Sequence, residues 1–189
     1  MTPEELVAAA GELLGVPVAQ AHGTVVAEVP AGQWVQAAGA ARDDPGLDLA
    51  MFDVLTAVDQ EPDGFDVVLR LWSPAGRHAL VLRCRVPRED PRLPSLTGVF
   101  AGAGWHERSV HEMFGVAFDG HPHLAPLLLA DDFGAHPLRK DFVLASRVVR
   151  PWPGAVEPGQ SAAEAAAVAS RSPRRRTLPP GVPPPGSWP

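Results

Sequence analysis

Two adjacent runs, Phe65 to Trp72 and His78 to Val86, constrain the fold more than any other part of the sequence. Both are rich in apolar and β-branched residues, and the SPAG stretch between them has the composition of a turn. In the second run Arg83 and Arg85 alternate with apolar residues, as a strand with one solvated face requires. The sequence therefore predicts a β-hairpin in which Cys84 is a small buried hydrophobic residue.

A capped helix start precedes these strands. Thr2 stands before Pro3 and two glutamates, which gives an N-cap, proline at the first helical position and acids in the first turn. This pattern predicts a helix from about residue 3 to 14. The run from Leu47 to Asp59 places apolar residues close to helical spacing and predicts a second helix. We expect an α+β domain over residues 1–114 with a mainly antiparallel sheet, completed by strands at 24–29 and 34–36 and a helix at 105–114.

Composition and charge exclude several classes of function. The net charge is −6, so the chain lacks the basic face that a free-standing nucleic-acid binder needs. Cys84 is the only cysteine, which excludes an intramolecular disulfide and a self-contained cysteine-ligated Fe–S cluster. No apolar run approaches the roughly 20 residues that span a bilayer, so we expect membrane contact only through a partner. Pro, Ala and Arg dominate residues 151–189, which predicts a disordered tail.

The segment from Trp105 to Phe142 holds the best indication of function. After Gly115 it is interrupted by Asp-Gly and His-Pro turns, yet it is too rich in Leu and Phe to be disordered. We expect residues 115–150 to form an extended arm whose polar and apolar groups are satisfied against a partner. On the preceding helix, Glu107 with His111 and Arg108 with Glu112 have the i, i+4 spacing of ion pairs.

Histidines in this segment allow a second interpretation. His106 and His111 are five residues apart, whereas a zinc helix needs histidines at i and i+4 to face one metal. His121, His123 and His136 lie beside turns and could converge on an ion. A stand-alone metal-dependent hydrolase therefore stays open as an alternative of another class, although the sequence shows no metal box.

Two linked motifs in the segment carry a family resemblance. The first matches the run E-R-E-x-x-D-M-F-G-I-x-F-x-G-H-P-D-L-R-R at Glu107, Arg108, Met113, Phe114, Gly115, Phe118, Gly120, His121, Pro122 and Leu124. The second, residues 135–142, follows G-H-P-L-R-K-D-F almost letter for letter. The chain resembles the C-type subunit, the 30 kDa subunit family, of the bacterial NADH:quinone oxidoreductase, respiratory complex I. The sequence departs from the family's pattern at Ser109, Glu112, His123, Ala125 and Pro126.

The resemblance implies a cofactor-free, non-catalytic subunit in the peripheral arm of a proton-translocating enzyme, on the cytoplasmic face of the bacterial cell membrane. It would brace the large quinone-site subunit (D-type) and the neighbouring Fe–S subunits (B- and I-type), to which the Fe–S clusters, FMN, NADH and quinone belong. Alternatives are the equivalent subunit of an energy-converting membrane-bound hydrogenase or of a complex I-like enzyme with another donor. The implied subunit-interface residues are Glu107, Arg108, Glu112, Phe114, Gly120, His121, Pro122, His136, Pro137, Leu138, Arg139, Lys140 and Asp141.

Overall fold

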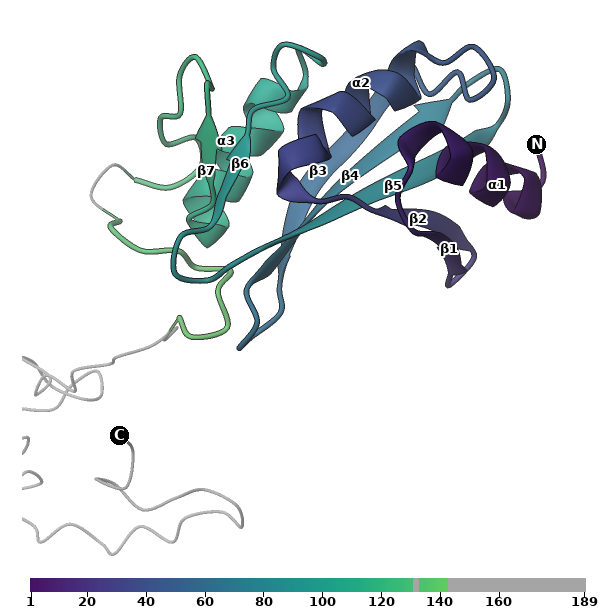
Figure 1. Cartoon of the computed structure of the whole chain (residues 1–189). Coiled ribbons are helices and arrows are strands. Elements are labelled where there is room, and N and C mark those ends of the chain that lie inside the picture. Colours follow the sequence, from purple (N-terminus) through teal and green to yellow (C-terminus); the bar gives the residue numbers. More distant parts are fainter. Residues whose placement is uncertain (131–132, 143–189) are drawn as a thin grey trace, which may run out of the picture. The chain divides into compact units, whose positions relative to one another are not determined.

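The computed structural model describes residues 1–130 and 133–142. The expected tail at 151–189 and the end of the expected arm at 143–150 lie outside the described residues. Within the described part, helices α1 (Pro3–Leu14), α2 (Trp34–Asp43) and α3 (Ala103–Phe114) accompany a five-stranded sheet and a smaller two-stranded one (Figure 1). This arrangement confirms the predicted α+β class.

The large sheet has the strand order β1-β2-β5-β4-β3. Its strands are β1 (Val18–Ala21), β2 (Thr24–Glu28), β3 (Met51–Asp59), β4 (Phe65–Ser73) and β5 (His78–Val86). All neighbours are antiparallel except β2 and β5, which are parallel. The predicted hairpin is β4 and β5, paired in register from Phe65 with Val86 to Ser73 with His78. Strands β6 (Arg92–Pro94) and β7 (Ala117–Asp119) form the parallel two-stranded sheet beside α3.

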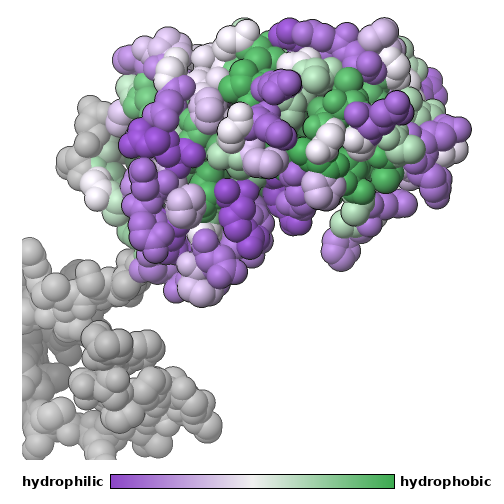
Figure 2. Space-filling model, in the orientation of Figure 1, coloured by the Kyte–Doolittle hydropathy of each residue, from purple (hydrophilic) through white to green (hydrophobic). Residues whose placement is uncertain are grey.

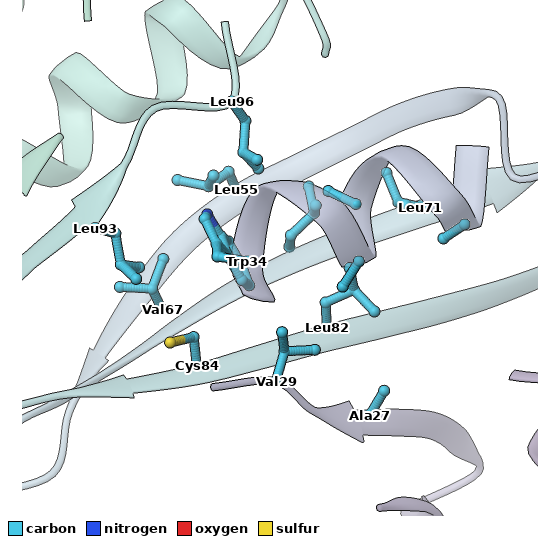
Figure 3. Packing of buried hydrophobic residues seen from close by; sticks show 14 of the residues in the cluster. Ala27, Val29, Trp34, Leu55, Val67, Leu71, Leu82, Cys84, Leu93 and Leu96 are labelled. Carbon is cyan, nitrogen blue, oxygen red and sulfur yellow. The ribbon is translucent and has the colours of Figure 1, made fainter. Parts of the chain in front are cut away.

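The core lies on the face of the large sheet that α1 and α2 cover. Alternate residues of β4 and β5, such as Leu69, Leu82 and Cys84, have no exposed surface. Figure 3 shows Trp34 of α2 pointing into this cluster near Leu55 and Val67. Burial raises the pKa of the Cys84 thiol to about 11, so this cysteine is a core residue rather than a nucleophile.

Two predicted elements are wrong. The expected strand at 34–36 is the start of α2, whose buried positions Trp34, Ala37, Ala38 and Ala41 follow helical spacing. The expected helix at 47–59 is strand β3, which pairs with β4 along its length. Its apolar residues are near helical spacing by coincidence, because the buried positions in its second half alternate with exposed ones.

The helix predicted at 3–14 is confirmed, and the one predicted at 105–114 begins two residues earlier, at Ala103. The Thr2 hydroxyl accepts a hydrogen bond from Glu5 N, and the Glu5 carboxylate accepts one from Thr2 N, which completes a capping box at the start of α1. Both α1 and α3 end at a glycine in the left-handed conformation, Gly15 and Gly115. Among the described residues, no helix is long and apolar enough to span a membrane.

Candidate interface site on helix α3 and the ribbon that follows it

The residues after α3, 115–130 and 133–142, form an irregular ribbon that the side chains of α3 hold in place. Arg108 donates hydrogen bonds from Nε to Ala125 O (2.8 Å) and from Nη2 to Pro126 O. Four residues further along the same helix face, the Glu112 carboxylate accepts the backbone N–H groups of 127–129 at 3.1, 2.9 and 2.8 Å. These contacts fix the ribbon along α3.

The surroundings of Glu112 favour its charged form. Burial opposes ionisation, but the hydrogen bonds from Leu129, Leu128 and Leu127, together with the nearby charge of Arg108, outweigh burial and lower the pKa. The carboxylate is therefore ionised at neutral pH and makes charge-assisted hydrogen bonds to three consecutive amides. Its role is to fasten the ribbon.

Glu107 connects α3 to Ser95 and Leu96, and its surroundings raise its pKa, whereas those of Glu112 lower the pKa. Its side chain is fully buried and accepts hydrogen bonds from Leu96 N (2.6 Å) and from the Ser95 hydroxyl (2.7 Å). Its Oε2 also lies 4.0 Å from Nε2 of His121, which itself bonds to Gly104 O at 3.0 Å. Burial raises the pKa of Glu107, although these hydrogen bonds oppose the rise.

The second motif supplies the C-terminal cap of α3. A helix leaves its last four carbonyl groups without intrahelical partners, and here all four accept hydrogen bonds. His111 O accepts from Gly115 N, while the other three accept from the ribbon. Glu112 O is bonded by His136 Nδ1 at 2.9 Å, Met113 O by Leu138 N at 3.2 Å, and Phe114 O by Arg139 Nε. The H-P-L-R sequence therefore closes the helix from more than twenty residues downstream.

The end of the motif is anchored to the edge of the large sheet. Asp59, at the end of β3, accepts hydrogen bonds from Lys140 N (2.8 Å) and from Arg88, and Arg88 also pairs with Asp141 at 3.0 Å. Burial disfavours the charged form of Asp59, but the bonds from Lys140 N and Arg88 prevail and lower its pKa. The Arg88 and Arg139 guanidinium groups lie 5.0 and 5.2 Å from the centroid of the buried Phe65 ring.

Gly115 leaves the space that this arrangement needs. Its backbone is in the left-handed region at φ 77°, and a β-carbon there would collide with the side chains of Arg139 and His136. The position therefore requires a residue without a side chain. The glycine that ends α3 therefore also makes room for the cap.

The predicted interface residues divide by exposure into two groups. Several are inside or partly covered, and their polar groups make the contacts within the chain that are described above. Their role at a subunit interface stays a prediction. The i, i+4 pairs Glu107–His111 and Arg108–Glu112 do not form as salt bridges in the described part of the chain. The covered residues are Glu107, Arg108, Glu112, Phe114, His121, His136, Pro137 and Arg139, and the exposed ones are Gly120, Pro122, Leu138, Lys140 and Asp141.

Sequence reasoning missed residues that complete the site from other elements. Asp59 and Arg88 were not linked to the motif, because they are 81 and 53 residues away from their partners Lys140 and Asp141. Trp105, the first residue of the predicted helix at 105–114, is 64% exposed, and Arg108 lies 5.4 Å from its ring. Only the Trp-x-x-Arg spacing on one helix face could have indicated that pair.

The metal interpretation gains no support from the described residues. Across 1–130 and 133–142, no group of three or more His, Cys, Asp or Glu side chains is arranged to hold a metal ion. His111 Nδ1 bonds to Val116 O at 2.9 Å, and His106 Nδ1 lies 3.2 Å from Leu55 O. These histidines are engaged with backbone groups of their own chain.

Comparison with known proteins identifies the family of this chain. Residues 27–148 match the family described as the respiratory-chain NADH dehydrogenase 30 Kd subunit. The chain belongs to this family, as its two motifs indicated. Its relatives named as the C-type subunit of NADH-quinone oxidoreductase include one from Roseiflexus castenholzii, 43% identical over 111 residues that make up 57% of this chain and 63% of the relative.

Other relatives and two solved structures agree. The Thermus thermophilus NADH-quinone oxidoreductase subunit 5 is 40% identical over 102 residues, 51% of this chain and 49% of that protein. The chain thus spans less than two thirds of these relatives. Among structures, the trypsin-resistant fragment of Nqo5 matches with a TM-score of 0.55 and 26% identity, over 65% of this chain and all of the fragment. A chain of the archaeal membrane-bound sulfane sulfur reductase matches with a TM-score of 0.65 and 25% identity, over 75% of this chain and 85% of that one.

Proposed function

We propose that this chain is a cofactor-free, non-catalytic structural subunit in the peripheral arm of a proton-translocating NADH:quinone oxidoreductase, on the cytoplasmic face of the bacterial membrane. Family membership supports the type of complex. The ribbon supports the structural role, because its internal contacts hold an irregular segment rigid without placing a reactive group at the surface. In this role the subunit holds its neighbours in fixed relative positions, and those neighbours carry the redox chemistry.

One observation carries the proposal: the fixed ribbon and α3 expose large hydrophobic side chains. Trp105, Leu128 and Leu138 are 64%, 66% and 56% exposed, and Phe133 is 41% exposed. Exposed aromatic and aliphatic residues held on a rigid support beside arginine have the composition of an interface. Figure 2 shows, from one side, hydrophobic residues interspersed with hydrophilic ones at the α3 end of the molecule, as an interface of mixed polarity requires.

The partners we propose are the large quinone-site subunit and the neighbouring Fe–S subunits. One relative carries the double designation C/D, and the match fills only 23% of its length, which supports placing the quinone-site (D-type) subunit beside this chain. The Fe–S clusters, FMN, NADH and quinone would belong to the partners. The single cysteine, buried in the core, supports this division.

A second candidate has its own support. The match to a chain of the archaeal membrane-bound sulfane sulfur reductase has the higher TM-score of the two structures, although the identity is 25%. The equivalent structural subunit of an energy-converting hydrogenase, or of a complex I-like enzyme with another donor, would use the same fold. Both candidates give the ribbon the same role and differ in the redox reaction of the assembled complex.

The test is affinity purification of the tagged full chain from detergent-solubilised membranes. We expect large and Fe–S subunits to be recovered with it, and NADH-dependent quinone reduction in the recovered complex would distinguish the first candidate from the second. Recovery as a lone monomer would contradict the proposal. Stoichiometric tightly bound zinc in that monomer would favour a metal-dependent hydrolase instead.

Surface variants locate the interface. Leu128→Ser and Trp105→Ser change exposed side chains, so we expect the isolated domain to keep its stability within about 0.5 kcal/mol while recovery of partners falls. Met51→Ser is the matched control, since Met51 is 50% exposed but lies on the large sheet. Equal recovery with all three variants would show that the ribbon does not contact the partners.

A further inference from the structure

A hollow at the far end of the large sheet from α3 combines basic and aromatic groups that the proposed function does not use. It has a volume of about 280 Å³ and lies between the start of α1 and the turn that joins β4 to β5. Its lining includes Arg70, Arg77, Trp72, His78 and Thr24, and no aspartate or glutamate contributes to it. The lining itself lacks carboxylates although the chain has a net charge of −6, and among its two arginines only Arg70 is paired within the described residues, with Asp53 beside the hollow.

Arg77 lies at the hollow, in a turn whose backbone conformation is unfavourable for arginine. Its φ is 51°, in the left-handed region where glycine or asparagine is preferred, so the backbone conformation costs about 1 kcal/mol. The turn is fixed by hydrogen bonds from Arg77 N to Ser73 O (2.8 Å) and from Gly76 N to the Ser73 hydroxyl (3.0 Å). Within residues 1–130 and 133–142, the Arg77 guanidinium makes no hydrogen bond or ion pair. An arginine kept in a strained position without an internal partner points to a role outside the fold.

Arg70 and Trp72 of β4 supply a second guanidinium group and an aromatic ring to the hollow. Arg70 pairs with Asp53 through Nη1 and lies 5.7 Å from the centroid of the Trp72 ring. Its Nε and Nη2 groups have no partner in the described part of the chain. Both arginines line the hollow and can therefore offer N–H groups to one phosphate, which accepts paired hydrogen bonds from planar guanidinium groups. The half-exposed indole provides a flat apolar wall beside them.

We propose that this hollow binds a phosphate monoester, with the phosphate on Arg77 and Arg70 and the attached organic group against Trp72. The volume is close to the lower limit of small-molecule pockets, which suits one phosphate and one ring or a short apolar stem. The phosphate can come from a free nucleotide or from a lipid headgroup. Adenosine monophosphate and vesicles that contain phosphatidic acid represent these two sources.

The test uses the full chain and two variants that separate charge from strain. Arg77→Gly removes the guanidinium and relieves the positive φ, so we expect equal or higher melting temperature but phosphate binding that is weaker by about tenfold or more. His22→Gly relieves another positive φ, 50°, in the turn between β1 and β2, and His22 does not line the hollow. We therefore expect His22→Gly to leave binding unchanged.

Binding is measured by NMR, through the indole N–H signal of Trp72 and the amide of Arg77, during titration with adenosine monophosphate. Co-sedimentation with phosphatidylcholine vesicles, with and without phosphatidic acid, is the lipid arm. Saturable Arg77-dependent binding in the first arm identifies a nucleotide-like ligand, and in the second arm a lipid headgroup. The proposal is overturned if neither arm shows binding, or if Arg77→Gly binds as the wild-type chain does.

Discussion

Replacing Arg139 with alanine tests whether this residue caps α3 within the chain or contacts another subunit. Arg139 donates a charge-assisted hydrogen bond to Phe114 O, worth about 1.5–3 kcal/mol. Its charge at the end of α3 adds about 0.3–1 kcal/mol, and its position over Phe65 adds about 0.5–1 kcal/mol. The structure therefore predicts a loss of about 2–5 kcal/mol in the free energy of unfolding.

Urea denaturation of the isolated chain gives this loss directly, and a thermal scan should show a melting temperature lower by roughly 4–20 °C. Arg139→Lys should recover only part of the loss, because lysine keeps the charge but not the planar donor. Arg92→Ala is the matched control. Arg92 is 51% exposed and pairs with Asp119 at the surface, so its removal should cost less than about 1 kcal/mol.

The opposite outcome would refute the reasoning. If Arg139→Ala left the stability within about 0.5 kcal/mol of the wild-type value but prevented assembly, the arginine would be a subunit contact. The hydrogen bond to Phe114 O would then contribute nothing to the fold. If the variant lost stability and assembly together, the cap would be needed to hold the interface in place.

Three further predictions concern the same site. Gly115→Ala should destabilise the domain by more than about 1 kcal/mol in urea denaturation, through the positive φ and through collision with the cap. Glu112→Ala should raise hydrogen exchange at the amides of 127–129, whereas Glu12→Ala, an exposed change in α1, should not. The folded-state pKa of Glu107 is raised, so the wild-type chain should lose stability relative to Glu107→Gln as the pH rises above about 4, and parallel stability curves would contradict this.

The fold was predictable from sequence wherever local patterns agreed with tertiary contacts. The α1 capping box and the alternating β4–β5 hairpin are local signals, and both were interpreted correctly. Strand β3 was not, because Phe52, Leu55 and Val58 mimic helical spacing and only pairing with β4 decides the outcome. Helix α2 could have been found from the small buried alanines spaced around Trp34, a pattern that carries little hydrophobic signal.

The residues of the candidate site were predicted from the sequence, but the groups that they contact were not. The two motifs indicated which residues belong together, whereas their polar chemistry was assigned to neighbouring subunits. In the structure these polar side chains form hydrogen bonds with backbone groups of their own chain. The partners are the amides of 127–129 and the carbonyl groups at the end of α3. Contacts from a side chain to a distant backbone group leave no pattern of charges or spacing, so they could not be derived without the structure.

The cap supplied by a distant segment has a consequence for synthesis of the protein. While the ribosome is still producing residues before Arg139, the carbonyl end of α3 stays open and the ring of Phe65 lacks one of its two guanidinium covers. The nascent chain therefore cannot complete this part of its fold until the ribbon has been made. A chain that stops within the ribbon, before His136, would contain the hairpin but lack the cap of α3.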